Sequence, residues 1–380
     1  MKALDPAGEG FSVSGAPQMT REQVLEALRD VQDPELHKSI VELDMVRDIQ
    51  IRDGAVKVEA LLTIGACPLR ETIITSIEER VRQLPGVQSV QVSLGVMTQD
   101  QRQALIGKLH GGEISARRRS SFLTAESPTR IILVASGKGG VGKSTVTVNL
   151  AVALRQAGHR VGIIDADVYG FSIPRMLGLS GQPTIIDQMI IPLEKDGIRV
   201  MSIGFLLPNE GEAVVWRGPM LHKTLTTFIG EVHWGDDLEY LLIDLPPGTG
   251  DVSITLAQTL PQSHMVIVTT PQAAAVAVAQ RAAKMAEKVN MEVIGIIENM
   301  SGYQPSVDGP PVYIFGRGGG LRLAEMLGVP LLGEIPLDPA IREGSDAGVP
   351  VVASHPESPA SRTFREAARR LGERLPVAPG

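Results

Sequence analysis

The pattern of hydrophobic positions changes along this chain of 380 residues and divides it into two parts. Near the N-terminus, apolar positions first follow helical spacing and then alternate as in half-buried strands. From Arg130 onward, short and wholly apolar runs alternate with helical segments, as in parallel sheets that are buried on both faces. The sequence therefore predicts a small α+β domain over residues 18–98 and an α/β domain over residues 129–375.

The first part predicts the element order αββαβ. Thr20 and Gln23 have the spacing of a capping box, which marks the start of a helix. The dipeptide Asp53-Gly54 is typical of a tight hairpin turn between two strands. The expected elements are a helix from Thr20, strands over 46–51 and 55–63, a helix over 68–84 and a strand over 87–94.

The second part predicts a mostly parallel sheet with helices on both faces. Residues 107–128, which precede it, are rich in Gly, Ser and Arg without periodicity and are expected to form a flexible linker. A long Ala-rich helix is expected over 272–289. The expected strands cover 131–134, 161–164, 241–243, 265–269, 293–297 and 331–335.

Composition narrows the range of functions. The formal net charge of −7 argues against a general nucleic-acid binder, because no global basic field attracts phosphates. No window approaches the length of an apolar membrane span, and the first 18 residues lack the apolar core of a signal peptide. A single cysteine suits a reducing compartment. We expect a soluble cytoplasmic protein that binds neither nucleic acid nor membrane.

A glycine-rich segment indicates nucleotide binding. The segment GKGGVGKS follows a predicted buried strand and precedes a predicted helix, which is the context that a phosphate loop requires. Its glycines let backbone N–H groups surround phosphate oxygens. Lys143 is expected at the β- and γ-phosphates of ATP, and Ser144 is expected to ligate Mg²⁺. The predicted nucleotide-binding residues are Gly137, Lys138, Gly139, Gly140, Val141, Gly142, Lys143, Ser144 and Thr145.

Acidic residues follow two of the later strands, at the sheet edge where ligands collect in open α/β folds. Asp244 begins the segment DLPPGTGD and is expected to hold Mg²⁺ through water. Asp165 and Asp167 follow an earlier strand, and either of them could orient the attacking water. Each aspartate alone is as typical of a helix cap or a solvated turn as of a nucleotide site. The prediction therefore depends on their joint occurrence with the phosphate loop.

A second lysine in the loop indicates a dimer. Lys138 has little use in a monomer, since Lys143 already neutralises the phosphates. It resembles the signature lysine of the deviant Walker ATPases, the MinD, ParA and nitrogenase iron-protein class. In that class the lysine reaches across a dimer interface to the partner's nucleotide. The resemblance implies a catalytic role for Lys138 in a nucleotide-bridged homodimer.

Longer segments resemble the Mrp/ApbC family of ATP-dependent iron–sulfur cluster carriers. The amino-terminal part, with Asp33-Pro34-Glu35 and Ala66-Cys67-Pro68-Leu69, resembles the small iron–sulfur assembly domain that is often fused to them. The resemblance implies an ATPase that receives clusters from a scaffold and transfers them to apoprotein clients, and it implies that Asn299 contacts adenine. The matching segments are GKGGVGKSTVTVN, DADVYGFSIPRML, DLPPGTGD, ENMS and residues 315–347.

One departure from that family concerns the cluster. Many members carry Cys-x-x-Cys shortly after ENMS, whereas residues 302–309 of this chain contain no cysteine. Iron–sulfur clusters are typically held by four thiolates, and a dimer of this chain offers two. Cys67 is expected at a helix N-terminus, where the dipole lowers the pKa of a thiol, so it is the candidate ligand for a cluster or iron. The alternative is a half-buried apolar side chain.

Other classes of function stay open. Relatives in the deviant Walker class position cargo on membranes or DNA, and residues 361–375 form a basic amphipathic segment that could lie on a membrane. Its apolar face is small, which favours a helix docked on the domain. A P-loop ligase would need a substrate pocket, which no segment of the sequence indicates.

Overall fold

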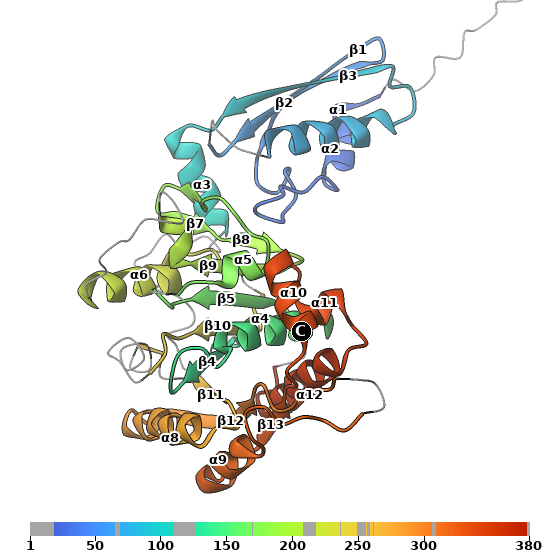
Figure 1. The fold of residues 1–380 in the computed structure, drawn as a ribbon. Helices are drawn as coiled ribbons and strands as arrows, with labels where there is room; N and C mark the ends of the chain where they lie inside the picture. The colour runs from blue at the N-terminus through green and yellow to red at the C-terminus, as the bar shows by residue number, and fades with distance from the viewer. Residues whose placement is uncertain are drawn as a thin grey trace, which may run out of the picture. The chain divides into compact units, whose positions relative to one another are not determined.

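The computed structural model describes residues 19–64, 69–109, 127–168, 170–207, 218–235, 237–248, 256, 259–260, 262–305 and 309–377. The chain divides into two compact units, residues 1–114 and 115–380, each with its own sheet (Figure 1).

The N-terminal unit has the predicted order αββαβ. Its sheet has the order β1-β2-β3, with β1 antiparallel and β3 parallel to the central β2. Helix α2 packs on β3, and α1 packs on α2 and β1. The elements are α1 (Arg21–Leu28), β1 (Val46–Arg52), β2 (Ala55–Leu62), α2 (Arg70–Arg82) and β3 (Ser89–Val96), followed by α3 (Gln99–Leu109).

The local signals in this unit have the predicted geometry. Thr20 Oγ1 accepts the Gln23 backbone N–H at 3.2 Å, and Gln23 Oε1 accepts the Thr20 N–H at 2.9 Å, so the capping box is complete. Asp53 and Gly54 both have positive φ angles, 46° and 80°, as a type I′ hairpin turn requires.

Helix α3 was not among the predicted elements. It begins with a second reciprocal pair, Thr98 and Gln101, and it buries Leu105 and Leu109. Its last three residues, 107–109, lie where the linker was expected to begin, so that part of the prediction is wrong. Residues 110–126 lie outside the described residues, and the remaining limits of the linker and domains stay a prediction.

The second unit contains an eight-stranded sheet in the order β13-β12-β11-β4-β10-β5-β9-β8. All its neighbouring strands are parallel except the edge strand β8, which is antiparallel to β9. The six predicted strands are present as β4 (Arg130–Ser136), β5 (Val161–Asp165), β10 (Tyr240–Asp244), β11 (His264–Thr269), β12 (Glu292–Glu298) and β13 (Leu331–Glu334).

Helices cover both faces of this sheet, which confirms the predicted α/β architecture (Figure 1). Side chains of α6, α8 and α9 pack on one face, and those of α4, α5, α11 and α12 pack on the other. The helices are α4 (Lys143–Gln156), α5 (Ile173–Met176), α6 (Gly218–Gly230), α8 (Ala273–Lys288), α9 (Gly319–Leu327), α10 (Pro339–Ala347), α11 (Val351–Ser354) and α12 (Pro359–Arg374).

The segment between α5 and α6 holds short strands that the sequence did not predict. Runs of three residues contain too few positions to show a period. They are β6 (Thr184–Ile186), β7 (Met189–Ile191) and β8 (Leu193–Lys195), followed by β9 (Ile198–Ser202).

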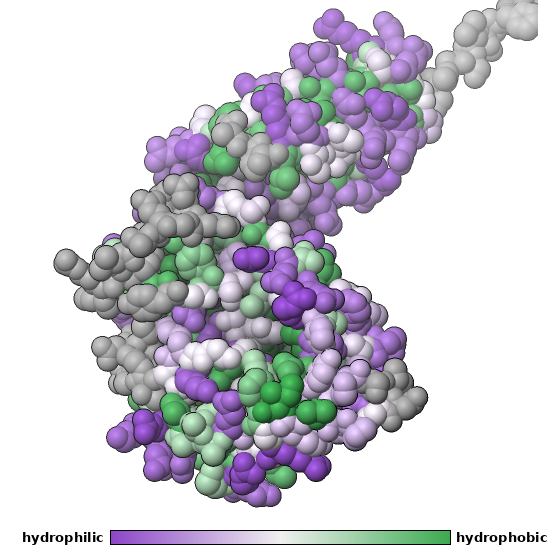
Figure 2. Space-filling view, viewed as in Figure 1, coloured by the Kyte–Doolittle hydropathy of each residue, from purple (hydrophilic) through white to green (hydrophobic). Residues whose placement is uncertain are grey.

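The C-terminal amphipathic segment is a docked helix. In α12 the side chains of Phe364, Ala367 and Leu371 are fully or almost fully buried, and the helix packs on α4 and β13. Among the described residues, no helix has the length and apolarity needed to cross a bilayer. Figure 2 shows a face on which hydrophilic residues predominate, with strongly hydrophobic residues gathered over the region of α12 and β13.

Candidate functional site

The phosphate loop joins β4 to α4 and depends on glycine at several positions. Gly140 and Gly142 have φ angles of 79° and 82°, in the left-handed region that residues with side chains rarely adopt. A Cβ on Gly137 would lie 2.4 Å from the backbone N of Ala279 in α8, and a Cβ on Gly142 would lie 2.2 Å from Asn299 Nδ2. The glycines therefore permit both the turn and its close packing.

The open side of the loop fits a phosphate group. A Cβ built on Gly140 would meet no heavy atom within 4 Å, and Gly139 and Gly140 are exposed. The N-terminus of α4, whose first backbone N–H groups lack intrahelical partners, begins at Lys143. Unpaired N–H groups and the helix dipole together favour an anion. The loop is thus shaped for the phosphates that the sequence predicts.

Behind the loop, Asp244 contacts three polar side chains of α4. It ends β10 and is fully buried. Its Oδ2 lies 2.7 Å from Lys143 Nζ and accepts a hydrogen bond from Ser144 Oγ at 2.5 Å, while its Oδ1 accepts one from Thr147 Oγ1 at 2.8 Å. Ser144 Oγ and Asp244 Oδ2 are oxygen donors of the kind that Mg²⁺ prefers, so these two residues fit the predicted metal site.

Asp165 and Asp167, which the sequence left equivalent, have different surroundings. Asp165 is fully buried, and its carboxylate accepts hydrogen bonds from the backbone N–H groups of Asp167 and Ile173 and from Ser202 Oγ, at 3.2, 3.3 and 3.2 Å. Burial, together with the charge of neighbouring Asp244, raises the pKa of Asp165 to about 7. Asp167 is 9% exposed, and its Oδ2 lies 3.7 Å from Lys143 Nζ.

Asn299 lies against the phosphate loop. Its Nδ2 donates to the Val141 carbonyl at 2.9 Å, and its Oδ1 accepts the Met300 N–H at 2.9 Å. The amide has two hydrogens on Nδ2, so the bond to Val141 leaves the second one for another acceptor. Contact with adenine stays a prediction, and the structure adds a role in supporting the loop.

Lys138 contacts the start of α8. Its Nζ donates to the side-chain oxygen of Gln272, the N-cap residue of α8, at 3.1 Å. The side chain is half-buried. Thr145, the last of the predicted nucleotide-binding residues, lies in the first turn of α4, where its carbonyl accepts Asn149 Nδ2 at 2.9 Å. The structure thus brings Lys143, Ser144, Asp167 and Asp244 together and places Asn299 against the loop, whereas the contacts of Lys138 and Thr145 are with other residues.

Sequence reasoning missed several buried partners of these residues. Thr147 follows Lys143 by four residues, so helical spacing could have identified it. Ser202 has no such signal, because its partner Asp165 is 37 residues away in sequence. Glu298 directly precedes Asn299, and its partner Gly320 is 22 residues away. Glu298, fully buried, accepts the Gly320 N–H at the start of α9 and the Ser301 hydroxyl, both at 2.5 Å.

The structure does not describe the candidate cluster ligand. Cys67 and Pro68 lie outside the described residues, and α2 is described from Arg70. Among the described residues, no group of three or more His, Cys, Asp or Glu side chains has a geometry suited to a metal ion. The role of Cys67 therefore stays a prediction.

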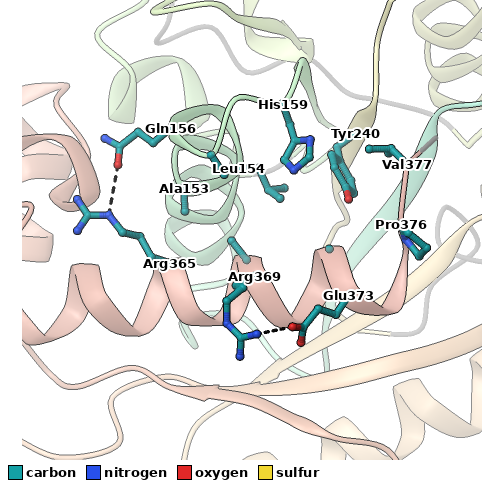
Figure 3. A pocket seen from close by; sticks show the side chains of 13 residues that line it. Ala153, Leu154, Gln156, His159, Tyr240, Arg365, Arg369, Glu373, Pro376 and Val377 are labelled. Atoms are coloured by element: carbon teal, nitrogen blue, oxygen red, sulfur yellow. Dashed lines mark hydrogen bonds and ion pairs between the residues drawn. The ribbon is translucent and has the colours of Figure 1, made fainter. Parts of the chain in front are cut away.

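The second unit also has a cavity away from the phosphate loop. It measures about 600 Å³ and lies between the carboxyl end of α4 and α12 (Figure 3). Ala153 and Leu154 line it, while Arg365 bonds to Gln156 and Arg369 bonds to Glu373 at its edge. Since α4 carries Lys143 at its other end, about 15 Å away at 1.5 Å per residue, this cavity is separate from the predicted nucleotide site.

These features define a class of protein. A glycine loop between β4 and α4, with a buried lysine and a half-buried serine at the start of α4 and a buried aspartate at the end of β10, is the site of a nucleotide-binding P-loop NTPase. Residues 127–372 match the model of the NUBPL iron-transfer P-loop NTPases, and residues 21–94 match that of an iron-sulfur cluster assembly protein. The chain belongs to the NUBPL iron-transfer P-loop NTPase family.

Known proteins are similar over most of the chain. The iron-sulfur cluster carrier protein of Mycobacterium bovis is 46% identical over 355 residues, which cover 92% of each chain. The iron-sulfur cluster carrier protein of Synechocystis is 43% identical over 366 residues, covering 95% of this chain and 99% of its own. A nucleotide-binding protein from Archaeoglobus fulgidus, solved with ADP, is 42% identical, with a TM-score of 0.51 over 58% of this chain and 86% of its own.

Proposed function

We propose that this protein hydrolyses ATP as a homodimer and carries an iron–sulfur cluster to apoprotein clients in the cytoplasm. The observation that carries the ATPase proposal is the contact of buried Lys143 and half-buried Ser144 with buried Asp244 behind an open phosphate loop. The cargo is inferred from the relatives. They are named iron-sulfur cluster carrier proteins, and their similarity extends over more than 90% of this chain.

The residues divide the chemistry between them. Lys143, whose buried ammonium group pairs with Asp244, would neutralise the β- and γ-phosphates of ATP. Ser144 and, through water, Asp244 would hold Mg²⁺, which supplies charge neutralisation at the phosphates. Asn299 would hold the loop and face the base through its second amide hydrogen.

The structure favours Asp167 over Asp165 for orienting the attacking water. The carboxylate of Asp165 already accepts hydrogen bonds from three donors, and the residue has no exposed surface. Asp167 retains some exposure and faces Lys143. One of the donors to Asp165 is the Asp167 N–H itself, so Asp165 would support the loop that positions Asp167.

Lys138 would act in the dimer. In this structure its ammonium group donates a hydrogen bond to a neutral side chain, Gln272. Lys138 can leave this contact without breaking an ion pair. A partner's phosphates would attract it more strongly than an amide oxygen does. This supports a lysine that contacts the nucleotide of the other subunit on dimer closure.

The alternative of a positioning ATPase on a membrane or on DNA is less well supported. The segment that favoured it, α12, buries its apolar face against α4 and β13 and does not present it to a bilayer. The net charge of −7 does not favour DNA.

Anaerobic reconstitution with iron and sulfide tests the cargo. We expect the dimer to bind iron and sulfide in a form that transfers to an apo-ferredoxin and depends on Cys67, with the remaining ligands supplied by small thiols or by the client. Cys67→Ser keeps the size of the side chain and removes the soft ligand. Equal iron and sulfide in wild-type and Cys67→Ser proteins would exclude Cys67 as a ligand. No bound iron in either protein would refute the carrier function and leave the ATPase.

A further inference from the structure

The residue Thr147 occupies a position in α4 that the nucleotide chemistry described above does not use. It lies four residues after Lys143 and is fully buried. Its hydroxyl Oγ1 lies 3.1 Å from the Lys143 carbonyl and 2.8 Å from Asp244 Oδ1. A threonine inside a helix ordinarily donates to the carbonyl four residues earlier. Here a second and closer acceptor competes for the same proton.

The carboxylate is the stronger of the two acceptors. A hydroxyl has one proton to donate, and an ionised carboxylate accepts only. Hydrogen bonds to a charged acceptor are shorter and roughly twice as strong as neutral ones, which agrees with the shorter distance to Asp244. Among the described residues, Thr147 is the residue that donates a hydrogen bond to Asp244 Oδ1. Without it, a fully buried carboxylate oxygen would lose its partner.

The two oxygens of Asp244 thus have separate tasks. Oδ2 faces Lys143 and Ser144, which are the residues of the nucleotide and metal site. Oδ1 faces Thr147, one turn deeper along α4. The terminal torsion of an aspartate is broad and roughly two-fold, so the backbone of β10 does not by itself fix the plane of the carboxylate. The Thr147 hydroxyl restrains that plane at Oδ1, as Lys143 and Ser144 do at Oδ2.

We propose that Thr147 is a positioning residue for the Mg²⁺ site, holding the Asp244 carboxylate so that Oδ2 faces Ser144, the residue with which Asp244 would hold Mg²⁺. The proposal rests on the proposed function in that it assumes Mg²⁺ and nucleotide at this loop. Partners that orient metal-binding residues are typically worth 10–100-fold in metal affinity. Thr147→Val keeps the shape of the side chain and removes the hydroxyl. It should therefore raise about tenfold the Mg²⁺ concentration that is needed to strengthen nucleotide binding.

The test measures binding rather than turnover. A fluorescent ATP analogue is titrated into full-length wild-type, Thr147→Val, Thr147→Ser and Thr147→Ala proteins, first in EDTA and then at increasing Mg²⁺. We expect the Val and Ala variants to need about tenfold more Mg²⁺ for half of the Mg²⁺-dependent gain in affinity, with the affinity in EDTA unchanged. Thr147→Ser keeps the donor and should restore the wild-type midpoint.

Thr226→Val is the matched control. Thr226 is an exposed helical threonine whose hydroxyl donates to the carbonyl of His222, four residues earlier, at 2.9 Å. It should behave as wild type. Should Thr147→Val not fold, as judged by circular dichroism, the comparison of Thr147→Ala with Thr147→Ser decides the question.

Two results would overturn the proposal. One is a Mg²⁺ midpoint that is the same in all four proteins. The other is an equal loss of affinity in EDTA and in Mg²⁺, which would show that Thr147 only packs α4. Failure of the proposed ATPase looks different, since the wild-type protein would then bind Mg²⁺ and nucleotide without releasing phosphate, while the shifted midpoint of Thr147→Val would persist.

Discussion

Buried charge has different partners in the two units of this protein. In the second unit, buried Asp244 at the end of β10 pairs with Lys143 of α4, and it lies beside Asp165 of β5. In the described part of the N-terminal unit, Asp33 is the one charged side chain that is buried, and it accepts the N–H groups of Glu35 and Leu36, both at 2.9 Å.

The difference separates a site from a turn. A carboxylate satisfied by backbone N–H groups two and three residues away stabilises its own loop and needs no distant partner. A carboxylate satisfied by an ammonium and two hydroxyls about one hundred residues away in sequence is held there by the whole fold. Since a buried ion pair is weak evidence for stability, the second arrangement points to function.

The largest expected effect is that of Lys143→Ala on ATP hydrolysis. Removing the ammonium group removes the charge that would stabilise the transferring phosphoryl group, so the rate of phosphate release should fall on the order of 10³-fold. Steady-state phosphate release measures this, and Lys288→Ala, an exposed lysine at the end of α8, is the control. Phosphate release at a near-wild-type rate would refute the assigned role.

A pH-dependent effect is expected for Asp165→Asn. The folded-state pKa of Asp165, about 7, lies above its ordinary value of 3.8, so between these pH values the folded protein holds a proton that the unfolded chain has released. The wild-type protein should therefore lose stability relative to Asp165→Asn as the pH rises from about 4 to about 7, by up to about 1.4 kcal/mol per pH unit.

Urea unfolding at a series of pH values, without Mg²⁺ or nucleotide, measures that difference. The charged groups nearest Asp165 are Asp244 and Lys143, with Asp167 beside it in sequence. Above about pH 7 the two stability curves should run parallel. Parallel curves over the whole range would mean that Asp165 titrates normally.

Lys138→Ala should have a smaller effect that depends on protein concentration. Nucleotide binding by the isolated chain should stay intact, because the ammonium group bonds to Gln272 rather than facing Asp244. ATP-dependent dimer closure and hydrolysis should fall about tenfold, which corresponds to about 1.4 kcal/mol. Sedimentation and ATPase assays over concentrations that span dimer dissociation measure both. Equal activity of both proteins throughout would contradict the dimer role.

A local effect on stability, with none on the nucleotide site, is expected for Asp33→Ala in the N-terminal unit. Two backbone N–H groups would lose their acceptor, which should destabilise this unit by about 1–2 kcal/mol. Asp33→Asn keeps an acceptor and should recover most of that loss. Hydrogen exchange over residues 19–109 measures the local stability, and ATP affinity serves as the control. A loss of ATP affinity in Asp33→Ala would show that this buried carboxylate is more than a turn.

Much of the fold was predictable because its signals are local. The Thr20 capping box, the Asp53-Gly54 turn and the apolar runs of β4, β5 and β10 each depend on residues that are neighbours in sequence. The phosphate loop belongs to the same group, since its glycines and Lys143 lie within eight residues. The short strands β6 to β8 were missed because three residues show no period.

The sequence by itself determined the class of site and the residues that could form it. Tertiary structure decided which task each of them can perform. Asp165 and Asp167 are chemically identical and two positions apart, yet one is buried among three donors while the other faces Lys143. That difference depends partly on the sheet, because it places β9 and β10 on either side of β5, so that the Ser202 hydroxyl and the Asp244 carboxylate lie beside Asp165.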